Sequence, residues 1–309
     1  MRTSRFDSSV PNIRICQLAA WFLAGFIPAS ASGQGLKVFI SADMEGVVGV
    51  VNEEQLGPGG FEYGRFREFM TREVLAAIDG ARSAGATEVV VADSHGNGLN
   101  LLIEMLPVDV TVVRSWPRPL GMMQGIDETF DAAIFIGYHA GTTNPEGVRA
   151  HTFSSATLAD VRLNGRSALE AGFNAAIAGH FGVPVIMISG DDAAVEEARA
   201  FIGELEGAVV KWNTGFHSAR SLTPEASYAL IRERVVTAME RLDSFEPTVL
   251  PTPVTLDIRF KNYRPSEVLA FLPVVERTSS HTVRFVGQDI LEIARFMQFL
   301  SYFNSGLTP

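Results

Sequence analysis

Cysteine is almost missing from this chain of 309 residues: the single one, Cys16, lies in an N-terminal segment that we expect to be removed. The mature protein would then contain no thiol. This absence excludes disulfide bonds, thiolate metal ligands and cysteine nucleophiles together. A mature chain of this length is ample for one large domain or two small ones, so its stability must come from a packed core.

The sequence also lacks any run of lysines and arginines, and its net charge is −10. Surfaces that bind nucleic acid normally carry a basic patch. No nucleic-acid partner is therefore expected, and a small cationic or zwitterionic substrate suits the charge better. No Gly-x-Ser-x-Gly motif is present, which leaves a covalent serine mechanism of the hydrolase type without support.

Long apolar runs are absent after residue 31, so no transmembrane helix is expected in that part of the chain. Before it, three arginines precede the apolar stretch 15–28, and Ala-Ser-Ala occupies positions 29–31. This order is typical of a secretory signal peptide that is cleaved after Ala31. An uncleaved membrane anchor is the alternative, but an apolar core of about 13 residues is short of the roughly 20 that a span requires.

We therefore expect residues 1–31 to form a signal peptide and residues 32–309 to form the mature domain. The protein would be exported, to the periplasm or as a secreted protein, with no stable membrane insertion after removal of the leader. Within the mature domain, the proline-rich segment 244–253 indicates a linker or a crossing between subdomains.

Through the rest of the chain, short apolar runs, which indicate strands, alternate with segments whose apolar residues have helical spacing. The run 36–40, the helix predicted over 66–84 and the run 89–92 indicate a parallel βαβ unit. Asn164-Gly165 predicts a type I′ hairpin turn, which would make the sheet mixed. The predicted fold class is α/β: a three-layer sandwich around a mixed, mostly parallel sheet, with a smaller C-terminal α+β portion. Further strands are predicted at 108–113, 132–136, 183–189, 208–212, 254–260 and 282–286, and further helices at 169–181, 193–203, 223–242 and 290–303.

Acidic and histidine side chains follow several of these strands directly. Asp43 and Glu45 come after the first strand, His95 after the second and His139 after the run 132–136. Ligands of open α/β sheets bind outside the carboxyl ends of the strands. Carboxylate oxygens and imidazole nitrogens together form a ligand set that suits zinc or a similar divalent metal. The sequence therefore predicts a metal-dependent hydrolase.

Each of these side chains also has an ordinary structural explanation. Asp43 and Glu45 share one face of a regular strand and can reach one metal pair with Asp43 as a bridge, but Asp43 can instead cap a turn while Glu45 is solvated. His95 lies in a glycine-rich loop and can be a surface residue. Asp93 either orients an imidazole or caps that loop. His139 can be a buried neutral histidine bonded to the backbone.

Two further candidates lie later in the chain. His151 follows a polar loop, and Glu170 opens an amphipathic helix, where the macrodipole favours an acidic residue whatever its function. The remaining histidines do not follow a strand in this way. We interpret His180 as a cation at a helix C-terminus, and His217 and His281 as surface or core residues.

Taken together, the motifs resemble those of the zinc-dependent D-aminopeptidases of the DppA type. The resemblance extends from about residue 36 to residue 303. The motifs that carry it are SADMEG at 41–46, DSH at 93–95, GYHA at 137–140, HTF at 151–153 and EAGFNA at 170–175.

The resemblance implies a site with two zinc ions and a catalytic histidine. The metal ligands that it implies are Asp43, Glu45, His95, His139 and Glu170. Asp43 would bridge the two ions, and His151 matches the catalytic histidine. The implied reaction is hydrolysis of the N-terminal residue of a short peptide, with a preference for D-amino acids, by a water that the two zinc ions activate. A ring-like homo-oligomer is implied as well.

Two other functions remain open at this point. Two-metal sites also serve phosphoesterases and deacylases, although the chain has no evident basic cluster for a phosphate. An exported protein related to peptide transport can also be a non-catalytic periplasmic peptide-binding protein.

Overall fold

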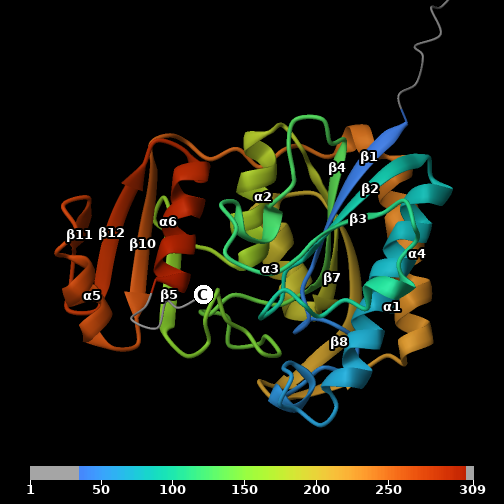
Figure 1. Cartoon of the computed structure of the whole chain (residues 1–309), viewed down its shortest axis with the longest axis horizontal. Coiled ribbons are helices and arrows are strands. Elements are labelled where there is room, and N and C mark those ends of the chain that lie inside the picture. Colours follow the sequence, from blue (N-terminus) through green and yellow to red (C-terminus); the bar gives the residue numbers. More distant parts are fainter. Residues whose placement is uncertain (1–34, 304–309) are drawn as a thin grey trace, which may run out of the picture. The chain divides into compact units, whose positions relative to one another are not determined.

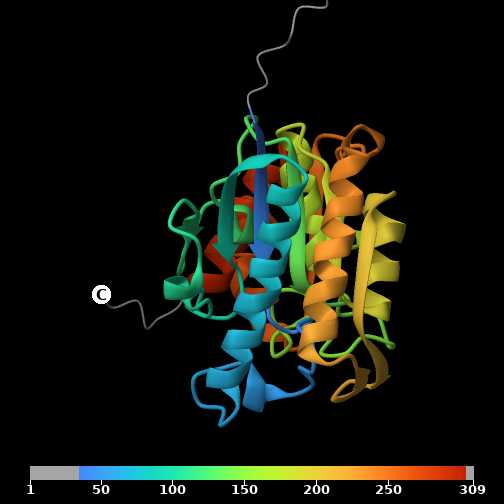
Figure 2. The same ribbon diagram turned by 90° about the vertical axis from the view of Figure 1, so that its right-hand side faces the viewer.

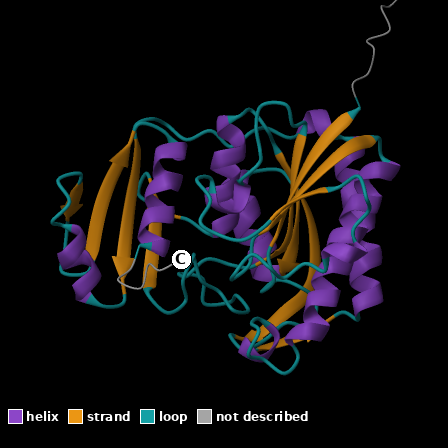
Figure 3. Cartoon of the chain, viewed as in Figure 1, coloured by secondary structure: helices purple, strands orange, loops and turns teal. Residues whose placement is uncertain are grey.

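The structure, a computed structural model, describes residues 35–303, and this part contains two β-sheets with helices packed on them (Figure 1, Figure 3). The predicted signal peptide, residues 1–31, lies outside the described residues and stays a prediction. No helix among residues 35–303 combines the length and the apolarity needed to cross a membrane.

The larger sheet has seven strands in the order β3-β2-β1-β4-β7-β8-β9. Every neighbouring pair is parallel except β8 and β9, which confirms the predicted mixed, mostly parallel sheet. The strands are β1 (Leu36–Ala42), β2 (Ala86–Asp93), β3 (Thr111–Val113), β4 (Ala132–Tyr138), β7 (Val185–Asp191), β8 (Glu206–Gly215) and β9 (Ser218–Ser221).

Helices cover both faces of this sheet, because its central strands are apolar on both sides. On one face, α1 (Tyr63–Ser83) and α4 (Pro224–Glu240) pack side by side (Figure 2). On the other face lie α2 (Glu170–His180) and α3 (Asp192–Ile202). Within β1 the side chains alternate: Val38 and Ile40 join the core with α1 and α4, and Phe39 joins the opposite core. The three-layer prediction is confirmed.

The smaller sheet is antiparallel, with five strands in the order β11-β12-β10-β5-β6. Its strands are β5 (Leu158–Leu163), β6 (Arg166–Ser167), β10 (Val254–Phe260), β11 (Val275–Arg277) and β12 (Thr282–Gly287). The helices α5 (Tyr263–Leu269) and α6 (Ile290–Tyr302) accompany it, and Phe285 of β12 stacks on Phe296 of α6. Short 3₁₀ helices elsewhere are η1 (Glu53–Gln55), η2 (Ile103–Met105), η3 (Gly121–Met123) and η4 (Leu242–Ser244).

The hairpin β5–β6 has the predicted turn but belongs to a different sheet than expected. Asn164 and Gly165 both have positive φ, 49° and 81°, as a type I′ turn requires. However, β5 pairs with β10, almost a hundred residues later, and not with the large sheet. The prediction that this hairpin makes the main sheet mixed is therefore wrong; β9 does so. The C-terminal α+β portion is completed by a hairpin from the middle of the chain.

A carboxyl group is buried between α1 and α4. The side chain of Glu73 is fully buried and accepts hydrogen bonds from the Val48 backbone N–H (3.0 Å) and the Ser227 hydroxyl (2.7 Å). Burial raises the pKa of Glu73 to about 7, although both hydrogen bonds act in the opposite direction. Folded Glu73 therefore keeps its proton at pH values where the unfolded chain has lost it.

We expect Glu73→Gln to change how stability depends on pH. Between the ordinary pKa of 4.5 and the folded value of about 7, only the folded state holds the proton, so wild-type stability falls as the pH rises through this window. The full loss is about 3 kcal/mol for such a shift. Glutamine does not titrate, so the variant should gain free energy of unfolding relative to wild type between about pH 5 and pH 8. Urea denaturation of chelator-treated protein, at about pH 5 and about pH 8, measures the difference in free energy of unfolding between variant and wild type. A difference that is equal at the two pH values would contradict the prediction.

Candidate metal centre

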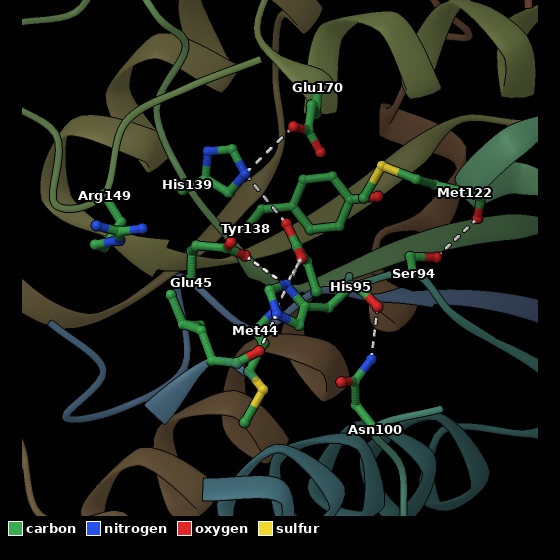
Figure 4. A network of polar contacts seen from close by, with 12 residues as sticks. Met44, Glu45, Ser94, His95, Asn100, Met122, Tyr138, His139, Arg149 and Glu170 are labelled. Carbon is green, nitrogen blue, oxygen red and sulfur yellow. Dashed lines mark hydrogen bonds and ion pairs between the residues drawn. The ribbon is translucent and has the colours of Figure 1, made fainter. Parts of the chain in front are cut away.

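The candidate ligands meet at one edge of the large sheet because neighbouring parallel strands end there together. β1 pairs in parallel with both β2 and β4. Asp43 directly follows β1, His95 follows β2 by two residues, and His139 directly follows β4. The sequence prediction that these side chains converge is confirmed. Figure 4 shows His95 beside Glu45, and His139 facing Glu170.

Asp43 lies between two imidazoles. Its Oδ1 is 3.3 Å from Nδ1 of His95, and its Oδ2 is 3.3 Å from Nε2 of His139. Each imidazole also faces a second carboxylate: His95 Nδ1 is 2.9 Å from Oε2 of Glu45, and His139 Nε2 is 3.5 Å from Oε1 of Glu170. Two groups of one imidazole and two carboxylates thus share Asp43.

The second nitrogen of each imidazole ring is held by a backbone carbonyl. His95 Nε2 is 2.7 Å from the Leu56 oxygen, and His139 Nδ1 is 3.0 Å from the Ala140 oxygen. A carbonyl can only accept, so the ring nitrogen facing it carries the hydrogen. The other nitrogen then directs its lone pair at the carboxylate cluster once it is deprotonated, as in metal-binding histidines. For His139 the backbone bond, expected as an alternative to metal binding, is the feature that prepares the ring for it.

Glu170 is the first residue of α2 and also faces the cluster. Its Oε1 accepts a hydrogen bond from the backbone N–H of Phe153 (2.7 Å). This bond turns the side chain from the helix terminus towards His139. Glu170 is thus an acidic residue in the first turn of a helix and also lies where a metal ligand is predicted, and the two interpretations do not exclude each other.

The five side chains are buried, so the alternative of a solvated Glu45 is wrong. Burial and the charge of Glu45 raise the pKa of Asp43. Burial also disfavours ionisation of Glu45 and Glu170, but the nearby imidazoles outweigh it and lower both pKa values. Burial by itself lowers the pKa of the His95 and His139 imidazoles. The nearby carboxylates outweigh this effect and raise the pKa of each imidazole well above its ordinary value. The cluster therefore needs positive charge, either as imidazolium protons or as metal cations that replace them.

Two atoms at the centre of the cluster lack a hydrogen-bond partner within residues 35–303: Asp43 Oδ2 and His139 Nε2, both buried. Buried polar atoms normally have partners, so this pair points to an ion between them. Ligand atoms of Asp43, Glu45 and His139 lie within 4.8 Å of one another, as do those of His139, His151 and Glu170. The oxygen and nitrogen donors, with no thiolate among them, fit zinc.

His151 lies at the edge of this cluster. Its ring stacks on His139 with centroids 4.0 Å apart and planes 8° apart. Its Nδ1 is 2.8 Å from the Arg149 carbonyl oxygen and so carries the hydrogen, while Nε2 lies 3.7 Å from Glu170 and 3.9 Å from Glu45. This geometry suits a proton-transfer group and also permits a metal ligand.

Asp93 holds the loop that carries His95. Its carboxylate accepts hydrogen bonds from the backbone N–H groups of Asn100 (2.6 Å) and Leu101 (2.7 Å) and from the Asn100 amide (2.7 Å). Asp93 therefore caps this loop, and the alternative interpretation as an imidazole-orienting group is wrong. Asn100 also donates to the His95 carbonyl (2.6 Å). Sequence reasoning missed Asn100, because asparagine in a glycine-rich loop is an ordinary turn residue.

The other three histidines lie outside the cluster. None of them belongs to a candidate metal group among the residues that the structure describes. His180 is exposed at the C-terminal end of α2, as predicted; His217 contacts Arg149, and His281 contacts Ser280.

A cavity of about 180 Å³ gives access to the cluster. Four of the candidate ligands, Asp43, Glu45, His95 and Glu170, line it together with His151, and the rest of its walls come from distant parts of the chain, including α6. The other lining residues are Ser94, Gly96, Trp116, Met122, Phe153, Gln298, Ser301 and Tyr302. The ring of Trp116 stacks on that of Tyr302, with centroids 5.9 Å apart. The smaller sheet, through α6, thus completes the entrance to a site that belongs to the larger one.

Known proteins match this chain along almost all of its described length. A protein-family model described as D-aminopeptidase, the M55 peptidases, matches residues 36–299. A D-aminopeptidase of Bacillus subtilis (strain 168) is 35% identical over 266 residues, which cover 85% of this chain and 95% of that protein.

A solved structure agrees with the fold. It is described as the zinc-dependent D-aminopeptidase DppA from Bacillus subtilis, a self-compartmentalizing protease. It superimposes with a TM-score of 0.83 at 33% identity and covers 87% of this chain and 99% of that one. The resemblance noted in the sequence is confirmed. With the family model spanning both sheets, this chain belongs to the M55 family of D-aminopeptidases.

Proposed function

We propose that this protein is a zinc-dependent D-aminopeptidase that binds two zinc ions and removes the N-terminal residue of short peptides. The observation that carries the proposal is the buried cluster in which the carboxylates of Asp43, Glu45 and Glu170 face the imidazoles of His95 and His139. Two atoms at its centre, Asp43 Oδ2 and His139 Nε2, make no hydrogen bond. The zinc dependence of the related DppA structure supports the choice of metal.

The contacts suggest how the residues would divide between two ions. Asp43, Glu45 and His95 would hold one ion, and Asp43, His139 and Glu170 the other, since each imidazole faces two carboxylates and Asp43 is common to both groups. Bound zinc lowers the pKa of a water molecule to about 7 and polarises a carbonyl group.

His151 would move protons during the reaction. Its Nδ1–H is held by the Arg149 carbonyl, so Nε2 is the atom available to exchange a proton. At Nε2 it would take a proton from the attacking water and deliver it to the departing amine nitrogen. Stacking on His139 fixes the plane of the ring. The carboxylates of Asp43, Glu45 and Glu170 line the cavity and can bind the free amino group of a peptide, which suits an exopeptidase.

Assembly and location extend the proposal. The description of DppA as self-compartmentalizing supports a homo-oligomer for this chain, and a ring is the arrangement that we expect. The N-terminal sequence supports export, which would place the enzyme near cell-wall peptides that contain D-alanine, for recovery of D-amino acids outside the cytoplasm. Cell fractionation tests the location, and a cytosolic protein with its leader intact would contradict it.

Metal analysis combined with a substrate screen tests the proposed function. We expect two zinc ions per chain and faster hydrolysis of D-aminoacyl amides than of their L-forms, with no turnover of p-nitrophenyl phosphate. Hydrolysis of the phosphate alone would indicate a phosphoesterase. Tight binding of short D-peptides without turnover by the zinc-loaded protein would indicate a peptide-binding protein.

A further inference from the structure

The loop that carries Asp43 and Glu45 is buried but has no regular structure. Residues 43–50 follow β1 without forming a helix or strand, and nearly all of them are buried. Buried backbone groups need hydrogen-bond partners, and such a loop cannot supply them all itself. Two bonds are internal, from Val47 N–H to the Met44 carbonyl and from Val50 N–H to the Val47 carbonyl, and further partners come from other elements, which thereby set where the two carboxylates lie.

One side chain, Lys211 of β8, is the donor to three carbonyl groups of this loop. Lys211 is fully buried. Its Nζ donates to the carbonyl oxygens of Glu45, Val47 (3.1 Å) and Val50 (2.7 Å). An ammonium group has three hydrogens and no acceptor, so all of its donors are used by this one loop. The group is thereby committed to the backbone and is not available to a substrate.

The N–H groups of the same loop are held from other directions. The backbone N–H of Val48 donates to Glu73, and that of Gly49 donates to the Ser221 hydroxyl (2.9 Å). The N–H of Gly46 donates to the Gly137 carbonyl (2.7 Å), and a Cβ at Gly46 would lie 1.9 Å from the Tyr138 carbonyl oxygen, so the loop also presses closely on the end of β4.

The carbonyl group of Glu45 and the N–H of Gly46 belong to one peptide unit. Lys211 holds this unit by its oxygen, and the end of β4 holds it by its nitrogen. Because both the oxygen and the nitrogen of the peptide unit are hydrogen-bonded, the backbone that carries the Glu45 side chain has little freedom to move. Loss of the ammonium group would remove the hydrogen bond to the oxygen and leave only the one from the nitrogen.

We propose that Lys211 is a positioning residue for the metal centre, which orients Glu45 towards the ion shared with His95 and Asp43. This inference rests on the proposed two-zinc function. Glu45 contacts His95, whereas Glu170 contacts His139. Loss of Lys211 should therefore weaken the binding of the ion beside Glu45 and His95 and leave the binding of the other ion unchanged. A lysine that served only to stabilise the fold would not distinguish between the two ions.

The test compares Lys211→Met with Ser221→Ala. Methionine keeps most of the apolar stem and removes the ammonium group, while Ser221→Ala removes the contact to Gly49 of the same loop but does not touch Glu45. Zinc affinity is measured by competition with a chromophoric chelator, on protein whose fold is checked by circular dichroism. We expect a loss of about 10- to 100-fold in affinity for one ion in Lys211→Met, as for other residues behind a metal ligand, and unchanged affinities in Ser221→Ala.

Other outcomes have defined meanings. Unchanged affinity for both ions in folded Lys211→Met, or an equal loss for both, would overturn the positioning role. If Lys211→Met does not fold, Lys211→Leu, which also lacks a donor but is shorter, is measured in the same way and decides by the same criteria. Wild-type protein that binds fewer than two zinc ions would instead contradict the proposed function, and the two failures are thereby told apart.

Discussion

Asp43→Ala is expected to lose both zinc ions and with them the peptidase activity. Asp43 is the only carboxylate of the cluster that contacts both His95, through Oδ1, and His139, through Oδ2, each at 3.3 Å. Its removal takes a ligand from each ion and leaves two buried histidines without their shared counter-charge. We expect the affinity for zinc to fall by more than the roughly 10- to 100-fold typical of residues behind the ligands.

Elemental analysis after gel filtration measures the zinc that remains bound. Asp43→Asn serves as the matched variant, because an amide keeps the size of the side chain and an oxygen that can accept from the Met44 backbone N–H, a bond that Asp43 makes at 2.8 Å. The amide variant loses the charge and has an NH2 group in place of one of the two acceptor oxygens, so it cannot bridge two ions, and we expect it to lose zinc as well. Glu128→Gln, at an exposed position, controls for a change of net charge. Retention of two zinc ions in Asp43→Ala would refute the bridging role.

His151→Ala is expected to retain the fold and both zinc ions but to lose about 100- to 10,000-fold in turnover, the usual contribution of a proton-transfer residue. The ring approaches the carboxylates of Glu45 and Glu170 only to 3.9 and 3.7 Å, and its Nδ1–H is occupied by the Arg149 carbonyl. Nε2 is therefore placed for proton exchange. The comparison requires kinetics on protein saturated with zinc and metal analysis of the same samples.

His180→Ala is the control, since His180 is exposed at the end of α2 and lies outside the cluster. Full activity of zinc-loaded His151→Ala would end the catalytic assignment. Loss of one zinc ion together with activity would instead identify His151 as a ligand, which its distance from His139 and Glu170 also permits. The two roles are thus separated by the metal content and not by the activity.

Four of the candidate ligands could be found from the local sequence, because the sequence also indicates the sheet topology. Apolar strands followed by Asp43 and Glu45, by His95 and by His139 imply convergence as soon as the strands are parallel and adjacent, and β2, β1 and β4 are neighbours in that order. Glu170 and His151 had weaker signals. A helix N-terminus and a polar loop explain each of them without any function, and the family resemblance was needed to place them in the site.

The contributions of α6 and Lys211 could not be predicted in this way. α6 has the apolar periodicity of any helix that covers a sheet, yet Gln298, Ser301 and Tyr302 line the cavity. Lys211 stands in a strand where a lysine commonly faces solvent, and only the packing of β8 against the loop after β1 buries it. Neither role depends on residues that are near in sequence.

The sequence by itself determined the class of fold, the parallel order of strand and helix, and the chemistry of the carboxylates and imidazoles at the strand ends, because these follow from periodicity and residue type over short segments. Tertiary structure alone decided that the hairpin β5–β6 joins β10 in a second sheet, that α6 closes the cavity, and that Lys211 holds the loop of Glu45. The physical reason is that these depend on contacts between segments far apart in the chain, whose partners are selected by the packing of the whole core and not by any local pattern.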